Sequence, residues 1–176
     1  MQKTIVVLGM HRSATSLVAG GLSHEISMGD DLLPASNSNP HGHFEDRRFV
    51  RLNDRILSAA GGSWHRPPPL QAIHGVAERF SKQVQTALEQ AGNGNDIWGF
   101  KDPRTTLTVS VYLPFLHNPH FVCCFREPEQ VARSLQRRNQ FSMERGRQLA
   151  VIYNRRLLTF LDDYFGTDRE CVTDCR

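Results

Sequence analysis

The stretch Thr4-Ile-Val-Val-Leu-Gly-Met-His-Arg-Ser-Ala-Thr-Ser-Leu17 decides the fold class. Its apolar, β-branched run ends at a glycine, a short polar loop follows, and apolar residues then return at helical spacing, which predicts a strand, a loop and a helix. Such a turn directs backbone N–H groups and the positive end of the helix dipole at one anion. The hydroxyls of Ser13, Thr15 and Ser16 add donors. The sequence therefore predicts an anion-binding loop over residues 9–16.

The rest of the chain repeats the order strand, loop and helix. Short apolar runs predict further buried strands at residues 97–100 and 121–125, and amphipathic spacing predicts helices. The helices are expected at 45–60, 73–91, from 105 to Pro114, over a segment beginning at Pro128 and containing Arg138, and at 143–164, with a last short strand at 170–173. Strands joined by long helical crossovers form parallel sheets. We expect a three-layer α/β fold of the P-loop type, with a central parallel sheet flanked by helices.

Composition and charge exclude several classes of protein. The 176 residues are 39% hydrophobic and 22% charged, with a formal net charge of +3. These values suit an ordinary globular domain and are too weakly basic for a nucleic-acid binder. No apolar run approaches the roughly 20 residues that cross a bilayer, and the N-terminus leads into a strand pattern without signal-peptide character. We expect a single cytoplasmic domain over residues 1–176, without nucleic-acid or membrane partners.

The cysteines and histidines form no metal-binding pattern. Cys123 and Cys124 are adjacent within an apolar run, and Cys171 and Cys175 lie near the end of the sequence. Neither a CxxC pair nor a Cys/His ladder results, whereas structural zinc sites use such spacings. Buried thiols in a reducing compartment, and no metal ion, are the expectation.

The loop differs from the nucleotide-binding P-loop pattern G-x-x-x-x-G-K-[ST]. Gly9 and Ser16 match it, but Ala14 stands at the second glycine and Thr15 at the lysine. That lysine neutralises nucleotide phosphates, so a loop that lacks it and carries Arg12 suggests an anion of another shape, bound without metal. The alternative is an ordinary turn whose polar residues only cap the helix.

Four segments resemble sulfotransferases that use 3′-phosphoadenosine 5′-phosphosulfate (PAPS), particularly the bacterial and tyrosylprotein branches. Residues 9–16, Gly-Met-His-Arg-Ser-Ala-Thr-Ser, resemble the family's Gly-Met-x-Arg-Ser-Gly-Thr-[Ser/Thr] loop for the 5′-phosphosulfate, and Arg126 followed by Ser134 resembles its 3′-phosphate pair. Residues 98–104 and 41–46 resemble its Lys-Asp-Pro and Gly-[Tyr/His]-Phe-Glu segments. The resemblance implies these cofactor-binding residues: Gly9, His11, Arg12, Ser13, Ala14, Thr15, Ser16, Arg126 and Ser134.

The resemblance also implies a mechanism. Sulfuryl transfer needs the donor and acceptor held in line and charge stabilised on the leaving phosphate, for which Arg12 and Lys101 are suited. The acceptor proton needs a base, and the resemblance assigns this role to Glu45, with His43 as the next candidate. Asp102 is either a base or an anchor of the lysine loop, and we favour the anchor. The alternative for Glu45 is an ordinary first-turn acid stabilised by the helix dipole.

Several alternatives stay open at this stage. If residue 14 adopts positive φ, alanine costs about 1 kcal/mol and can tilt an amide, whereas in the first helical turn it is harmless. Other functions are a P-loop nucleotide or small-molecule kinase, or a non-catalytic nucleotide-binding module derived from a sulfotransferase. The acceptor is an unspecified small alcohol, carbohydrate or peptide hydroxyl, or an amine, with a pocket expected in residues 27–43 and 61–75. The oligomeric state is left undetermined.

Overall fold

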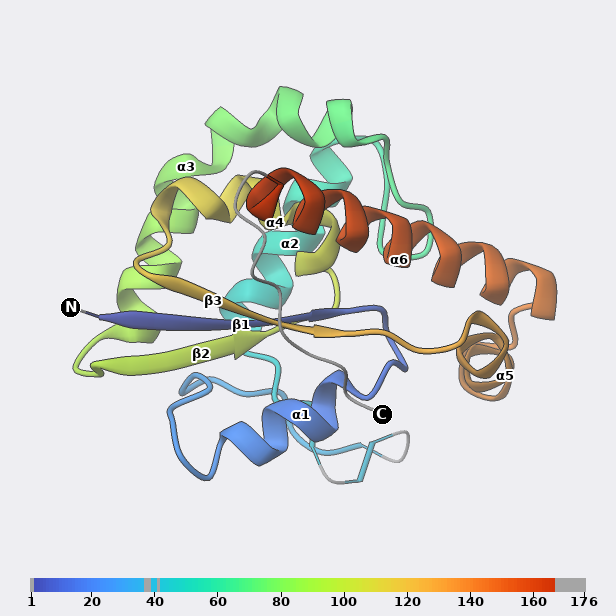
Figure 1. Ribbon diagram of the computed structural model, residues 1–176, viewed down its shortest axis with the longest axis horizontal. Coiled ribbons are helices and arrows are strands. Elements are labelled where there is room, and N and C mark those ends of the chain that lie inside the picture. The colour runs from blue at the N-terminus through green and yellow to red at the C-terminus, as the bar shows by residue number, and fades with distance from the viewer. Residues whose placement is uncertain (1, 37–38, 41, 167–176) are drawn as a thin grey trace.

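Three parallel strands form the sheet in the computed structural model, which describes residues 2–36, 39–40 and 42–166. β1 (Lys3–Gly9) lies in the middle, between β2 (Ile97–Lys101) and β3 (Pro119–Cys124). The register pairs Ile5 with Gly99 on one side and with His120 on the other. The strands run in the same direction, so their carboxyl ends meet at one edge of the sheet (Figure 1).

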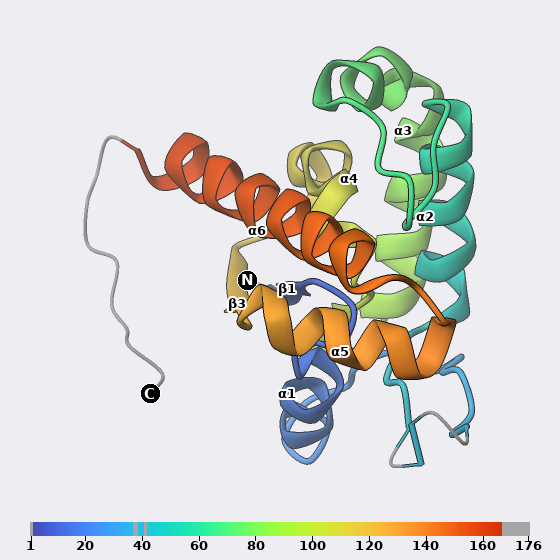
Figure 2. The same cartoon turned by 90° about the vertical axis from the view of Figure 1, so that its right-hand side faces the viewer.

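Six α-helices in the described part of the chain surround this sheet: α1 (Thr15–Leu22), α2 (Arg47–Ala59), α3 (Leu70–Gly92), α4 (Thr105–Tyr112), α5 (Pro128–Asn139) and α6 (Met143–Phe165). In Figure 1, α1 lies below the sheet, and α3, α4 and α6 lie above it. Figure 2 looks toward the carboxyl edge of the strands, where α5 crosses in front of the sheet. The α/β class and the parallel sheet are therefore confirmed.

Residues 5–8 of β1 are all apolar because both faces of the strand are covered. Val6 and Leu8 are fully buried in the larger hydrophobic cluster, where the rings of Phe49 and Phe100 stack at 4.2 Å between centroids. Val7 faces the opposite way and is buried in the smaller cluster, together with Ala19 of α1. Successive strand residues point to opposite faces, so a continuous apolar run is what a covered central strand needs.

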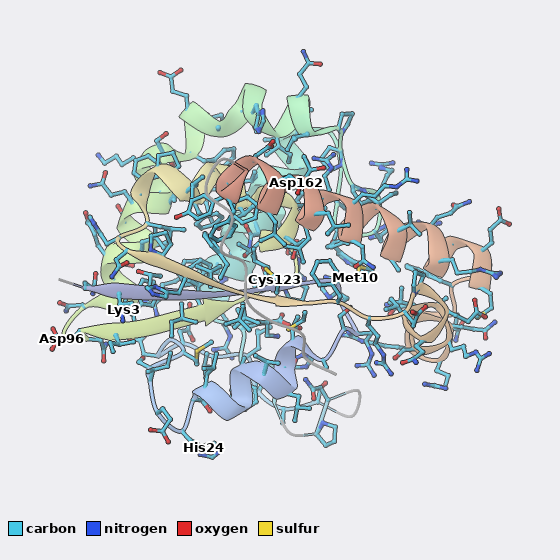
Figure 3. All side chains as sticks on the ribbon, viewed as in Figure 1. Lys3, Met10, His24, Asp96, Cys123 and Asp162 are labelled. Atoms are coloured by element: carbon cyan, nitrogen blue, oxygen red, sulfur yellow. The ribbon has the colours of Figure 1, made fainter. Side chains whose placement is uncertain are left out.

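The fold brings the three polar stretches of the sequence to one place. Residues 9–16, 101–104 and 126 onward each follow a strand, and all three leave the sheet at its carboxyl edge. Figure 3 marks this edge with Met10, whereas Lys3 and Asp96 mark the opposite edge. Ligands of parallel α/β sheets bind at the carboxyl ends of the strands.

Some predicted boundaries were wrong. The helix expected at 45–60 begins at Arg47, because the Asp46 side chain accepts the backbone N–H of Arg48 and caps it. Glu45 therefore lies outside the helix, and the first-turn interpretation of this acid is wrong. The third strand covers Pro119–Cys124 rather than 121–125, and the strand expected at 170–173 lies outside the described residues.

Pro114, the cysteines and the helix lengths bear on other expectations. Pro114 follows the end of α4 and lies in a 3₁₀ turn, Leu113–Phe115, as a proline that ends a helix does. Cys123 and Cys124 are half-buried rather than fully buried. None of the helices in the described ranges has the length and apolar character needed to span a membrane.

Candidate functional site

Gly9 begins the loop at a position where only glycine fits. Its φ is +151°, and a Cβ built there would lie 2.7 Å from the carbonyl oxygen of Cys124 and 2.9 Å from Cγ2 of Thr15. The Thr106 hydroxyl accepts a hydrogen bond from the Gly9 N–H at 2.8 Å and lies 3.2 Å from its carbonyl oxygen, to which it can donate. The start of the loop is therefore fixed by β3 on one side and by α4 on the other.

Ala14 occupies the left-handed region immediately before α1. Its φ is 64° and its ψ is 12°, and its side chain offers no hydrogen bond to cap the helix. Arg12 also has positive φ, at 70°. Of the two conformations considered for residue 14, the structure shows the strained one, which costs a non-glycine residue about 1–2 kcal/mol. Strain of this kind is frequent in loops that bind ligands.

The loop surrounds a hollow with a volume of about 200 Å³. Its lining residues are Arg12, Ala14, Thr15, Ser16, Leu17, Asn39 and Arg126. Beside it, the side-chain oxygen of Ser13 is buried and has no hydrogen-bond partner among the described residues. A buried hydroxyl without a partner is costly, so an anion or water that accepts its hydrogen would relieve the cost. The residues present thus fit an anionic group.

An arginine–serine group joins three separate segments of the chain. Arg12 Nε donates to Ser134 Oγ at 2.7 Å, and an Nη atom of Arg126 donates to the carbonyl oxygen of Arg12 at 2.8 Å. Ser134 lies on α5 and is only 4% exposed, whereas Arg126 is exposed just before that helix. Burial, together with the positive charges of Arg138, Arg126 and Arg137, lowers the pKa of Arg12. The excess positive charge favours binding of an anion.

A lysine–carboxylate group lies on the other side of the loop. Lys101, at the end of β2, is 1% exposed, and its Nζ lies 2.7 Å from Oε1 of Glu45. The same ammonium donates to Ser16 Oγ at 3.2 Å, and the Ser16 hydroxyl lies 3.3 Å from the carbonyl oxygen of His43, to which it can donate. Burial lowers the pKa of Lys101, although the Glu45 carboxylate opposes the shift. The predicted base and the predicted catalytic cation are thus partners of each other.

Asp102 anchors the segment after Lys101. It is fully buried, accepts from Arg104 Nη1 at 2.8 Å, and accepts from Asn53 Nδ2 at 2.8 Å. Arg104 also lies 2.8 Å from a carboxylate oxygen of Asp54 and 3.8 Å from Oε2 of Glu45. Burial opposes protonation of Arg104, but the charges of these carboxylates raise its pKa. With both oxygens engaged, Asp102 has the contacts of an anchor rather than those of a base.

The two histidines near the loop are placed differently. His43 Nε2 lies 2.9 Å from the hydroxyl of Ser36, and burial lowers the pKa of His43 while the charge of Glu45 opposes the shift. His11 is 8% exposed, and its ring packs against Trp64 with centroids 4.6 Å apart. Burial and the nearby cations hold the pKa of His11 well below its ordinary value. The His11 side chain does not line the hollow, and its assignment as a cofactor-binding residue stays a prediction.

Two supporting residues escaped the sequence analysis. Thr106 holds Gly9 across 97 positions of sequence, which no local pattern reveals. Asn53 is fully buried and donates to Asp102 and Thr105, while its carbonyl oxygen lies 2.6 Å from the Thr108 hydroxyl and 2.9 Å from that of Tyr112. The sequence did indicate a role for Asn53, because a polar residue on the apolar face of a helix needs buried hydrogen-bond partners.

The described residues contain no group of three or more His, Cys, Asp or Glu side chains that could hold a metal ion. The chain matches no protein-family model, no curated protein and no solved structure. A functional assignment therefore depends on the resemblance of the four segments and on the geometry described above.

Proposed function

We propose that this protein is a sulfotransferase of the P-loop fold class that transfers a sulfuryl group from PAPS to a hydroxyl or amine acceptor. One observation carries the proposal. Arg12, Arg126 and Ser134 come from separate parts of the sequence, and the resemblance assigned them to the donor. In the structure Arg12 of the donor-rich loop is hydrogen-bonded to Ser134 through its side chain and to Arg126 through its carbonyl oxygen. Nothing in a generic capped helix requires that assembly.

In this proposal the loop and the arginine–serine group divide the donor between them. The loop amides bind the 5′-phosphosulfate, since residues 14–16 line the hollow. The neighbouring Ser13 hydroxyl, which has no hydrogen-bond partner among the described residues, adds a donor. Arg126 and Ser134 bind the 3′-phosphate, because a guanidinium can bind a phosphate through two parallel hydrogen bonds. Arg12 belongs to the loop and is hydrogen-bonded to Ser134, and it stabilises the charge that develops on the leaving phosphate.

In this proposal Glu45 of the lysine–carboxylate group accepts the proton of the acceptor. Sulfuryl transfer breaks the bond between sulfur and the leaving phosphate oxygen and forms a bond between sulfur and the acceptor oxygen, which loses its proton. In the structure the Lys101 ammonium is paired with Glu45, with Nζ 2.7 Å from Oε1. When Lys101 turns instead toward the oxygens of the donor, Glu45 loses a positive neighbour and becomes a stronger base for the acceptor proton. Donor binding would thus prepare the base.

A second candidate is a non-catalytic module that binds the same nucleotide. The strained Ala14 and the tight Lys101–Glu45 pair favour it, since both oppose a site ready for turnover. A kinase is less well supported, because Thr15 stands where a nucleotide-binding loop has its lysine. The proposal keeps the cytoplasm as the location and leaves the acceptor at the level of a hydroxyl or an amine.

Calorimetric titration with 3′-phosphoadenosine 5′-phosphate, the desulfated product, tests the proposal. We expect binding that is unchanged when magnesium is replaced by EDTA. ATP with magnesium serves as the comparison ligand. Binding of ATP with magnesium, together with no binding of the 3′-phosphorylated nucleotide, would overturn both the sulfotransferase and the non-catalytic module. Transfer of labelled sulfate from PAPS to a panel of alcohols, phenols, sugars and amines then separates these two.

A further inference from the structure

A second, smaller cavity of about 60 Å³ lies among α4, α6 and the start of α3, which contributes Leu70 and His74, and it shares no lining residue with the hollow at the loop. Its polar lining includes Ser110 from α4 and Arg156 from α6. The cavity is large enough for a few water molecules or for one small organic ion. None of the roles proposed above uses it.

Arg156 is only partly satisfied in this cavity. Its Nη2 donates to the carbonyl oxygen of Pro68 at 2.7 Å. Its Nη1 is buried without a hydrogen-bond partner, and Arg156 forms no ion pair within the described part of the chain. Burial lowers the pKa of Arg156. A buried guanidinium edge of this kind calls for an acceptor, and an anionic acceptor gains most.

Ser110 supplies a second unmatched group. Its side-chain oxygen is also buried and has no partner in the described residues. Two donors from different helices, a charged N–H and a neutral O–H, therefore line the same small space. Two oxygens of one group can satisfy both donors at once, as those of a carboxylate do.

The remaining walls limit the size and charge of the ligand. Leu107, Val109 and Phe160 give the cavity an apolar side that suits a short alkyl chain. The carboxylate of Asp163 also lines the cavity, and it would repel a dianion such as phosphate more than a monoanion. We propose that this cavity is a binding site for a small aliphatic monocarboxylate of the size of acetate or propionate. Its carboxylate faces Arg156 and Ser110, and its alkyl part faces the apolar wall.

An NMR titration of the ¹⁵N-labelled full chain with sodium propionate tests this proposal, with sodium chloride used to keep the ionic strength constant. We expect saturable shifts of amides in α4 and α6 around the cavity. Propionamide, which has the same shape without the charge, should cause no saturable shift. Shifts confined to residues 9–16, shifts that do not saturate, or an equal response to propionamide would overturn the site, and the last two results would mean that the cavity holds only water.

Variants sharpen the test. Arg156→Met should weaken propionate binding at least about tenfold, the loss expected for one charge-assisted hydrogen bond. Arg155→Met removes the exposed neighbour on the same helix and should leave the affinity unchanged. Asp163→Asn should tighten binding severalfold by removing a repulsive charge. If Arg156→Met fails to fold, Ser110→Ala provides the same test with an expected loss of about threefold to tenfold. Unaltered binding in the folded variant at position 156 or 110 contradicts the proposal.

Discussion

The two charged groups on either side of the loop differ in how their charges are compensated. Arg126 is exposed, and its hydrogen bonds go to neutral groups, the Arg12 carbonyl and the side chain of Gln130. Lys101 is buried, and its ammonium contacts the carboxylate of Glu45. Among the described residues Arg126 makes no ion pair, so it can receive an anion without losing one, whereas Lys101 must first exchange partners.

This difference assigns nucleotide binding and sulfuryl transfer to different groups of residues. A buried ion pair is costly to break one side at a time, because the remaining charge is left uncompensated in a poorly solvated place. A ligand that offers Lys101 a new anionic partner removes that cost and leaves Glu45 with only the more distant Arg104, 3.8 Å away, as a cationic neighbour. We therefore expect nucleotide affinity to depend on the arginine–serine group and turnover to depend on the lysine–carboxylate group.

The largest expected effect comes from Glu45→Gln. Loss of a general base should lower sulfuryl transfer from PAPS by about 10²–10⁴-fold. Binding of 3′-phosphoadenosine 5′-phosphate should change little, because the arginine–serine group is intact. Single-turnover assays with an acceptor that the wild-type protein sulfates measure the loss, and Glu25→Gln, an exposed acid elsewhere, is the control. Full turnover in Glu45→Gln would move the base to His43.

Arg126→Ala tests the other group. Removing one charge-assisted contact to phosphate should cost about 1.5–3 kcal/mol of binding free energy for 3′-phosphoadenosine 5′-phosphate. Calorimetry measures the loss, and Arg133→Ala, an exposed arginine on α5, is the matched control. Equal affinities of the two variants would show that Arg126 does not contact the ligand.

His11 reports on both groups at once, because Arg104 and Lys101 on one side and Arg138 and Arg12 on the other lower its pKa in addition to burial. The folded protein keeps this imidazole neutral, while the unfolded chain binds a proton below its ordinary pKa of 6.5. The free energy of unfolding should therefore fall as the pH drops below that value, by up to about 1.4 kcal/mol per pH unit until the folded pKa is reached.

Urea unfolding at pH 7 and pH 5 measures this dependence in the wild-type protein, in His11→Gln and in His24→Gln. His24 is exposed, so its replacement should leave the slope with pH unchanged. His11→Gln should flatten the slope by about one proton. If both variants keep the wild-type slope, His11 is not held neutral by its surroundings.

The smallest expected effect belongs to Ala14→Gly. Glycine adopts positive φ without the steric cost that alanine has, so the free energy of unfolding should rise by about 1 kcal/mol. Ala19→Gly is a control of opposite sign, since Ala19 is buried within α1 and glycine there costs about 1 kcal/mol in helix propensity. Chemical denaturation measures both. A destabilised Ala14→Gly would show that the loop does not need positive φ at this position.

The sequence contained much of the fold but only part of the site. Buried strands can be predicted because a run such as 5–8 must be apolar on both faces. The polar residues at the ends of these runs indicate which edge of the sheet carries the loops. The conformation of Ala14 was not predictable, because alanine is common in helices and disfavours the left-handed region that it adopts here. The Lys101–Glu45 pair was not predictable either, since 56 residues separate its members and Glu45 lies just before α2, outside the sheet that carries Lys101.

The central claim is that the arginine–serine group recognises a 3′-phosphate, and one measurement tests it most directly. Calorimetry of the wild-type protein should give an affinity for 3′-phosphoadenosine 5′-phosphate at least about tenfold higher than for adenosine 5′-phosphate, which lacks that group. In Ser134→Ala the ratio of the two affinities should shrink. Equal affinities of the wild-type protein for both nucleotides would contradict the account.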